Sequence, residues 1–406
     1  MANQTLTSKQ AAAIISKVAN SILHDKLQFL KAIRTEDNAP WTRDDYKPGD
    51  TIKIARPAQF SVRKGRVLAP QDFQEDTVPL VVDNQVGVDV SFTSAEIATE
   101  IGIKQMAKRV LEPQMAVLAS AIEADVMAKA YKRVANFVGT PGTTPATFGV
   151  YGDALQRLDE NLAPMDEERF ALINPAANNK TVDGLKGLFN SQEAIAKQYK
   201  SGYLGDMNGF HFMRNNLLPI HKNGTQGGTP LINGAGQSGA SLITDGWSPG
   251  ATITAGTVIT ISGAQAVHPE TKVAYPYLKQ FVVTADVTAD GGGNATLAIN
   301  PPIAATTPKQ NVSAALVDNA AITLQTGAAN GLFPQNLLFH KDAVRFITLP
   351  LMLPDGVDFA AQETVDGISV RVVRQYDVVN DTLPCRLDVL YGSAVVRDDF
   401  MVRLTG

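Results

Sequence analysis

The side chains that could support chemistry in this chain are few and widely spaced. There is one cysteine, Cys385, and there are five histidines in 406 residues. A single cysteine excludes a paired-thiol redox centre, an intrachain disulfide and a zinc site built on several thiolates. The histidines are scattered along the chain, at His24, His211, His221, His268 and His340. This inventory predicts a protein without catalytic residues, a metal site or a bound cofactor.

One acidic run offers the only modest candidates for acid–base catalysis. Asp166, Glu167 and Glu168 are consecutive, and His211 follows later in the chain. One hypothesis is therefore an α/β enzyme with an accessory β-domain, in which these groups converge. We interpret the run instead as the first turn of a helix, where the helix dipole favours acidic side chains.

A glycine-rich motif, Gly234 to Gly239, has the spacing G-x-G-x-x-G of dinucleotide-binding loops. That function requires a preceding strand and a following helix whose N-terminus holds the pyrophosphate. Residues 241–250 contain two glycines and a proline, which disfavour a helix. We therefore interpret residues 223–241 as a flexible Gly/Ser linker.

Three further positions have simple structural interpretations. Asp286 and Asp290 lack calcium-loop spacing, and the sequence Asp290-Gly291-Gly292-Gly293-Asn294 predicts a hairpin turn. His340 follows an apolar run and is expected in the core or in a turn. Cys385 falls on the apolar side of a strand, which predicts a buried structural thiol.

The composition is that of an ordinary globular chain. Lys plus Arg is 36 and Asp plus Glu is 40, which gives a net charge of −4. This balance argues against a general nucleic-acid binder. No apolar run has membrane-spanning length, and residues 1–10 lack the apolar core of a signal peptide. We expect an unsecreted, cytosol-made protein without a membrane partner.

The N-terminal part is predicted to be extended and charged. Apolar residues at helical spacing predict an amphipathic helix over 11–31, followed by an arm over 34–50. Residues 51–85 alternate like a long hairpin whose tip, residues 63–66, is basic and whose return side is acidic. Such an excursion is a solvated hairpin or one that lies on a neighbouring subunit, where opposite charges meet. The proposed inter-subunit contacts are Arg56, Arg63, Lys64, Arg66, Asp72, Glu75 and Asp76.

The central and C-terminal parts alternate between helices and strands. Residues 86–92, 368–372 and 385–391 have the alternation of half-buried strands, and we expect them in one sheet. An Ala-rich helix with an apolar stripe follows Pro113, and residues 151–199 predict a mixed α/β region.

Between these parts lies a segment of different composition. It contains no arginine between Arg214 and Arg345, and short Thr- and Val-rich runs predict strands near residues 252–254, 258–261, 281–284 and 295–299. Strands at this spacing predict a small all-β barrel or sandwich, inserted into the surrounding domain.

This order of elements resembles the major capsid (coat) proteins of tailed phages, and more narrowly the P22-type coat family. The local likeness is strongest in residues 383–392 and in residues 260–302. The resemblance implies an α+β class and an HK97-like capsid fold with an inserted all-β barrel-like domain. The implied domains are an N-terminal helix and arm (1–50), an extended hairpin loop (51–85), a peripheral domain with a spine helix from about Gln105 to Val134 (86–140 and 354–406), an axial domain (141–222 and 326–353) and an inserted β-domain (223–325).

The resemblance implies assembly without catalysis. Hexamers and pentamers would form an icosahedral shell in the virion, built in the host cytoplasm with a scaffolding protein and a portal protein around double-stranded DNA. Mild acidity suits a container, because a wall that bound phosphates tightly would hinder DNA packing. The alternatives are another virion part, such as a tail tube or decoration protein, and the enzyme described above. A further hypothesis, known from some capsids, is an isopeptide bond between Lys64 and Asn380 of neighbouring subunits.

Overall fold

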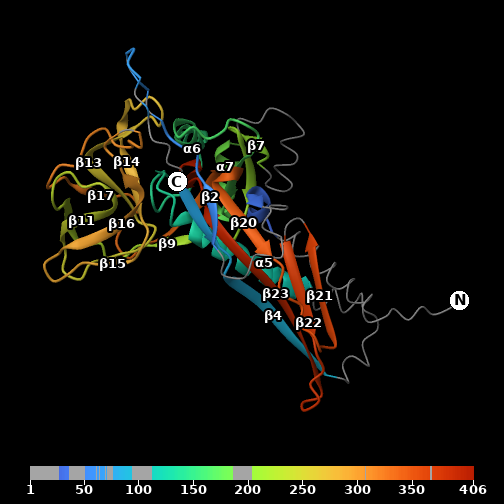
Figure 1. Ribbon diagram of the computed structural model, residues 1–406. Helices are drawn as coiled ribbons and strands as arrows, with labels where there is room; N and C mark the ends of the chain where they lie inside the picture. Colours follow the sequence, from blue (N-terminus) through green and yellow to red (C-terminus); the bar gives the residue numbers. More distant parts are fainter. Residues whose placement is uncertain are drawn as a thin grey trace. The chain divides into compact units, whose positions relative to one another are not determined.

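The computed structural model describes residues 27–35, 51–60, 62–63, 65–68, 70, 76–93, 112–185, 204–306, 308–365 and 368–406. Figure 1 shows their helices and strands and labels many of them. The described residues form two compact units, the first drawn from 1–54, 78–126 and 344–394 and the second from 55–77, 127–343 and 395–406. The helix predicted over 11–31, except for its last residues, and most of the arm over 34–50 lie outside the described residues.

A six-stranded sheet forms the centre of the first unit. Its order is β1-β20-β23-β22-β21, and β4 also pairs with β23. Leu387 of β23 stands between Val88 of β4 and Val372 of β22, so the three alternating segments share one sheet as predicted. The strands are β1 (Arg34–Thr35), β4 (Asn84–Thr93), β20 (Val344–Leu349), β21 (Phe359–Val365), β22 (Ile368–Arg374) and β23 (Thr382–Val395).

The longest described helix, α5 (Glu112–Tyr131), carries the predicted apolar stripe. Met115, Leu118 and Ile122 are almost fully buried, because spacings of three and four residues place them on one helix face. The buried carboxylate of Glu123 accepts the N–H of Phe29 at 2.5 Å and that of Gln28, which fixes the start of α2 (Phe29–Ala32). The Ala-rich helix is thus confirmed over the residues described.

A second six-stranded sheet, in the order β5-β24-β19-β6-β8-β7, lies in the second unit. Helix α6 (Phe148–Glu160) buries Tyr151, Ala154 and Leu158, and α7 (Pro175–Leu185) follows β6. This alternation confirms the predicted mixed α/β region over residues 151–185, and residues 186–199 lie outside the described residues. The sheet strands are β5 (Phe137–Val138), β6 (Arg169–Ile173), β7 (Asp206–Met207), β8 (Phe210–Arg214), β19 (Asn336–His340) and β24 (Met401–Leu404). The shorter elements are β9 (Ile220–Lys222), β18 (Leu332–Pro334), η3 (Lys341–Ala343) and η4 (Asp398–Phe400).

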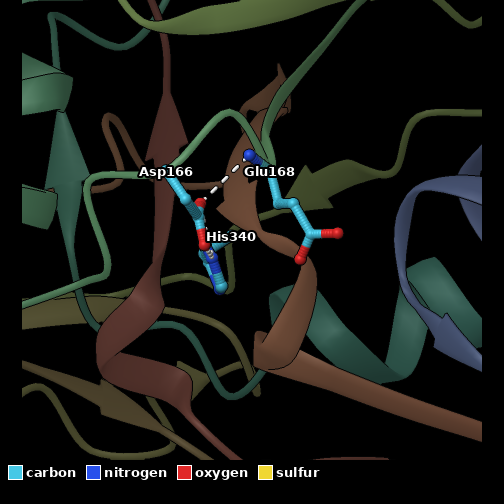
Figure 2. Close-up of side chains that lie close together, drawn as sticks. All are labelled: Asp166, Glu168 and His340. Atoms are coloured by element: carbon cyan, nitrogen blue, oxygen red, sulfur yellow. Dashed lines mark hydrogen bonds and ion pairs between the residues drawn. The ribbon is translucent and has the colours of Figure 1, made fainter.

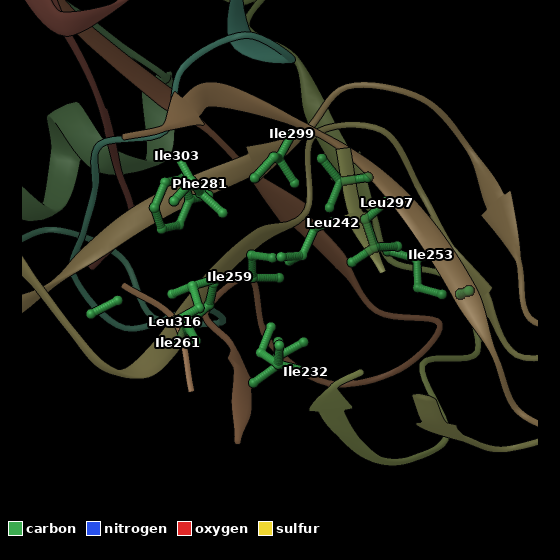
Figure 3. Packing of buried hydrophobic residues seen from close by; sticks show 14 of the residues in the cluster. Ile232, Leu242, Ile253, Ile259, Ile261, Phe281, Leu297, Ile299, Ile303 and Leu316 are labelled. Atoms are coloured by element: carbon green, nitrogen blue, oxygen red, sulfur yellow. The ribbon is translucent and has the colours of Figure 1, made fainter. Parts of the chain in front are cut away.

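The arginine-free segment forms a closed antiparallel barrel. Its strand order is β10-β11-β16-β14-β13-β17, and a bridge from Leu231 to Ala321 joins the two ends of that order. Figure 3 shows the apolar side chains that fill it, among them Leu242, Phe281 and Leu297. The predicted all-β barrel is confirmed. Its strands are β10 (Gly228–Ile232), β11 (Gly239–Trp247), β13 (Val258–Val267), β14 (Ala274–Val283), β16 (Ala295–Ile303) and β17 (Ile322–Leu324), with β12 (Thr252–Ile253) paired to β15 (Val287–Thr288).

The flexible linker predicted over 223–241 is wrong. The segment contains β10, a tight turn and the start of β11. Asn223 donates its side-chain amide to the carbonyls of Thr326, Gly327 and Ala328. The Gln237 side chain donates to the carbonyl of Asn233 before the turn and to that of Ile243 after it. The glycines there provide positive φ angles, such as +98° at Gly234, so they shape a turn.

The base of the predicted hairpin is present. Strand β2 (Thr51–Ala55) pairs with β3 (Thr77–Val81), and the N–H of Arg56 donates to the carbonyl of Asp76 at 2.7 Å. The described order of hairpin, strand, long helix, inserted barrel and closing strands matches the predicted α+β arrangement. Within the described residues, no helix combines the length and apolar character that crossing a bilayer requires.

Candidate functional site

The acidic run meets a histidine from a distant strand. Asp166 and Glu168 precede β6, and His340 ends β19, which pairs antiparallel with β6 so that His340 stands opposite Arg169. Their potential ligand atoms all lie within 4.8 Å of one another (Figure 2). The run leads into a strand, so our interpretation of it as a helix N-terminus is wrong.

The hydrogen bonds of this cluster define its chemistry. Nδ1 of the buried His340 accepts the N–H of Asp342 at 3.2 Å, so its Nε2 carries the proton and donates to Asp166 at 3.0 Å. Lys341 donates to Glu168 at 2.6 Å. Burial opposes ionisation of Asp166, but the N–H of Glu168 and His340 together hold the pKa of its carboxyl below the usual value. A metal ion would have to displace that proton and the Lys341 ammonium. The geometry therefore supports a structural role, in which these bonds connect the segment before β6 to the end of β19.

His211 joins the same run in a different way. Its Nδ1 bonds to Asp206 and its Nε2 to the backbone carbonyl of Glu167 at 2.6 Å. Asp206, opposed by partial burial, raises the pKa of His211, because a charged imidazole donates to both acceptors. The four proposed catalytic residues therefore do not converge on one substrate position. Asp166 and Glu168 face His340 and Lys341, and the acidic run presents only the backbone carbonyl of Glu167 to His211.

The charged hairpin presents an exposed tip, described at residues 62–63 and 65–68. Val62, Val67 and Leu68 are each at least 80% exposed. Arg63 donates to the carbonyls of Gly65 and Val67, which curls the tip, and Arg66 is exposed. Lys64, Asp72 and Glu75 lie outside the described residues.

Two of the proposed contact residues have partners within the chain. Arg56 donates to Asp398 at 2.8 Å, and Lys309 donates to both carboxylate oxygens of Asp76 at 2.7 Å. Both pairs sit at the neck of the hairpin, where it leaves β2 and returns to β3.

Sequence reasoning placed a connection between β22 and β23 but did not single out its acidic turn, residues 375–381, as an exposed surface. Tyr376 donates its hydroxyl to Asp381 and its N–H to Asp358. The amide of Asn380 and the N–H of Val379 bond to Asp377 and lower the pKa of its carboxyl. Val378 and Val379 are at least 80% exposed. Adjacent valines between aspartates in a turn were the signal that could have identified this surface.

The remaining motifs resolve as local structure. Gly234 to Gly239 is followed by strand β11, so the dinucleotide interpretation fails as expected. Asp290 accepts the N–H groups of Gly292 and Asn294 in the predicted turn. Cys385 is half-buried, which corrects the prediction of a buried thiol: it lies near the exposed end of β23.

Comparisons with known proteins give one family match. The model of the family described as P22 coat protein, gene protein 5, matches residues 43–406, which is nearly the whole chain. No curated protein matches this chain. Among solved structures, the chain is similar to one from Mycobacterium phage Che8, with 12% identity, a TM-score of 0.48 and coverage of 93% of this chain and 90% of that one. It is also similar to the mature capsid of bacteriophage PhiM1, with 10% identity, a TM-score of 0.43 and coverage of 90% and 83%.

Proposed function

The chain belongs to the P22 coat protein family, and we propose that its subunits assemble with a scaffolding protein into an icosahedral procapsid that receives double-stranded DNA. The family makes it a major capsid protein, which forms the shell of the virion. We further propose that it works without catalysis or cofactor, and that a portal protein joins the shell in the host cytoplasm. The net charge of −4 supports DNA enclosure without sequence-specific binding.

The exposed hairpin tip is the observation that carries inter-subunit assembly. Three aliphatic side chains at this tip are at least 80% exposed beside Arg63 and Arg66. Apolar side chains concentrated on a projecting loop mark an interaction surface, because burying them removes apolar area from water. A neighbouring subunit would bury them, and Lys64, Asp72 and Glu75 belong to the same proposed contact.

The acidic turn is the surface that we propose for the neighbour's side. It combines exposed Val378 and Val379 with Asp377 and Asp381, which complement a basic, aliphatic tip in both charge and polarity. Arg56 and Asp76 have partners inside their own subunit, so they would contribute to this contact through the position of the neck.

Each segment of the chain has a proposed place in the shell. We propose that the arm faces inward toward the scaffold, that the first sheet with α5 builds the peripheral domain and that the second sheet builds the axial domain. The support is the order of elements together with the confirmed sheets. The proposed domain boundaries remain those given by the sequence: 1–50, 51–85, 86–140 with 354–406, 141–222 with 326–353, and 223–325.

A charge swap between the two surfaces tests the proposal. Co-expression of Arg66→Glu subunits with scaffold is expected to lower the yield of shells, measured by sedimentation and electron microscopy. Adding Asp381→Lys should restore the yield, because opposite charges again meet. The control is Lys180→Glu, an equal change of charge at an exposed residue of α7. Normal shells from Arg66→Glu would contradict the contact, and tubes in place of closed shells would contradict the function.

The isopeptide hypothesis stays a hypothesis. Asn380 donates its amide to Asp377 at 2.7 Å, and Lys64 lies outside the described residues. Boiled shells that run only as monomers on a denaturing gel would exclude the bond.

A further inference from the structure

We propose that the inserted barrel holds the neck of the hairpin within its own subunit, and that Asp398 and Lys309 are the positioning residues of this neck clamp. The clamp consists of the pairs Arg56–Asp398 and Asp76–Lys309. The inference rests on the proposed function, in which the hairpin tip binds a neighbour. It gives the barrel a task in assembly: setting the direction in which the hairpin leaves the subunit.

The outgoing arm of the hairpin is held by Asp398. Nη2 of Arg56, the residue after β2, donates to Oδ1 of Asp398 at 2.8 Å, and the Asp398 side chain is only 10% exposed. Solvent and salt screen a partly buried pair less than a surface pair. This contact therefore restrains Arg56 more firmly than an ordinary surface ion pair would.

Asp398 is itself fixed by the barrel. Its second oxygen, Oδ2, accepts the side-chain amide of Asn300 at 2.6 Å, and the same amide nitrogen donates to the carbonyl of Arg133 at 2.9 Å. Asn300 lies in barrel strand β16 and is 6% exposed. A continuous series of hydrogen bonds thus runs from the barrel through Asp398 to the hairpin neck.

The returning arm is held by the barrel directly. Lys309 lies in the connection between β16 and β17, and its Nζ is 2.7 Å from both oxygens of Asp76, the residue before β3. The N–H of Arg56 donates to the carbonyl of Asp76, so both contacts act at the same level of the hairpin. One contact would allow the hairpin to pivot, whereas one on each arm fixes its direction.

This restraint has a consequence for assembly. A freely pivoting hairpin would lose conformational entropy on binding a neighbour, and that loss would weaken the contact. A hairpin whose direction is already fixed by its own barrel avoids most of that loss of conformational entropy. The clamp thus preorganises the loop that joins subunits.

Pulsed electron–electron distance measurements on unassembled subunits test the clamp. Spin labels are attached to cysteines introduced at two exposed positions, by Val67→Cys in the tip and Ser262→Cys in the barrel. The native cysteine is removed by Cys385→Ser. A narrow distribution of distances between the two labels is expected in this parent. Lys309→Glu or Asp398→Ala should broaden that distribution, because the hairpin is then free to pivot. Asp76→Lys added to Lys309→Glu should restore the narrow peak, because the ion pair is rebuilt with its charges exchanged.

The controls separate this inference from misfolding and from the docking contact. Lys309 is 46% exposed, so its variant keeps the barrel core, and Lys180→Glu should leave the peak unchanged. Arg66→Glu should also leave the peak narrow while lowering shell yield. If Arg66→Glu subunits assemble normally, the proposed contact between subunits is contradicted. The distances between the spin labels still test the neck clamp in that case. An unchanged distribution in both Lys309→Glu and Asp398→Ala, or a broad one in the parent, would overturn the clamp.

Discussion

Among the described residues, Arg403 has the largest fully buried side chain. Its Nη1 donates to the carbonyl of Gly256 at 2.7 Å. The guanidinium carbon lies 5.8 Å from the centre of the Tyr131 ring and 5.5 Å from that of Phe137. Burial lowers the pKa of Arg403 to about 9. The barrel loop that carries Gly256 is therefore packed against the second sheet through a buried charge.

Substituting Gly256 should reveal how tight this packing is. Gly256 has φ +99°, and an added Cβ would lie 3.0 Å from the Tyr131 ring and 3.1 Å from Nδ1 of His221. We expect Gly256→Ala to lose about 1–2 kcal/mol from the backbone conformation and about 1–3 kcal/mol more from overpacking. Urea unfolding measures the loss. The control is Gly250→Ala, where φ is +73° and no atom lies within 4 Å, so equal losses in the two variants would contradict the packing argument.

His221 should make the stability of the subunit depend on pH. Burial, with the nearby Arg403 charge, lowers its pKa from 6.5 to about 4. Below pH 6.5 His221 binds a proton in the unfolded chain but stays neutral in the folded chain. The free energy of unfolding therefore falls as the pH drops, and the fall ends near pH 4. The shift corresponds to roughly 3 kcal/mol between pH 7 and pH 4. Unfolding free energies of wild type and His221→Asn across this range measure it, and parallel pH profiles would contradict it.

Single-residue environments were the least predictable from sequence. The acidic run 166–168 has a composition that suits a helix start, but its partner His340 comes from a strand far along the chain. Cys385 was placed on the correct strand, where it pairs with both Arg374 and Val90, yet it is half-buried. Such details depend on register between distant segments, which local patterns do not encode.

Among the elements, the sheet of the first unit depends on a buried acid. Asp388 of β23 is 1% exposed and accepts bonds from Arg371 at 2.6 Å and Arg386 at 2.8 Å. Gly87 of β4 stands opposite, and a Cβ there would lie 2.5 Å from the carboxylate. The glycine therefore makes room for the ion pair within the sheet.

Removing this acid should destabilise the sheet strongly. Asp388→Ala leaves Arg371, whose side chain is 16% exposed, without its carboxylate, and breaking a buried pair costs about 3–5 kcal/mol. The Arg386 side chain is 56% exposed, so losing its partner adds little. Chemical unfolding of the subunit measures the loss. Asp83→Ala, at an exposed aspartate that accepts the side-chain amide of the adjacent Asn84 at 2.9 Å, is the matched control and should change little. A loss no larger than in that control would show that the arginines find other acceptors.

Whole elements were more predictable than residues, with one instructive failure. Alternation identified β4, β22 and β23 and their common sheet, because one buried face imposes a period of two. The same approach misjudged residues 223–241, since glycine suits both flexible linkers and tight turns. Only the bonds of Asn223 and Gln237 distinguish the two, and their acceptors include residues about a hundred positions away.

At the scale of the whole molecule, the even composition conceals a separation of charge. The hairpin tip is basic and aliphatic, the turn between β22 and β23 is acidic and aliphatic, and the barrel has no arginine. The sequence predicted a charged hairpin that either is solvated or meets opposite charge on a neighbouring subunit. It did not predict the neck clamp, because Asp76 and Lys309 are 233 positions apart and their approach requires the folded barrel.

The barrel should also fold when it is separated from the rest of the subunit. We expect a polypeptide of residues 224–327 to unfold cooperatively, because its core cluster lies within residues 232–322 and the bridge from Leu231 to Ala321 closes the strand order. Within the subunit, however, Val258 and Val282 pack against Ala135 and Phe137. The isolated barrel would expose both valines and lose about 1.5–3 kcal/mol of burial for each.

Because these valines are exposed only in the isolated barrel, the same substitution can be compared in the barrel and in the full subunit. Val258→Thr should destabilise the full subunit more than the isolated barrel, since only the subunit buries that side chain against its second sheet. Trp247, which is buried and donates to Thr244 at 2.8 Å, provides the fluorescence signal for unfolding in both. A broad, non-cooperative transition of the isolated barrel would show that its closed core is insufficient. Equal losses from Val258→Thr in barrel and subunit would show instead that this face contributes nothing to docking.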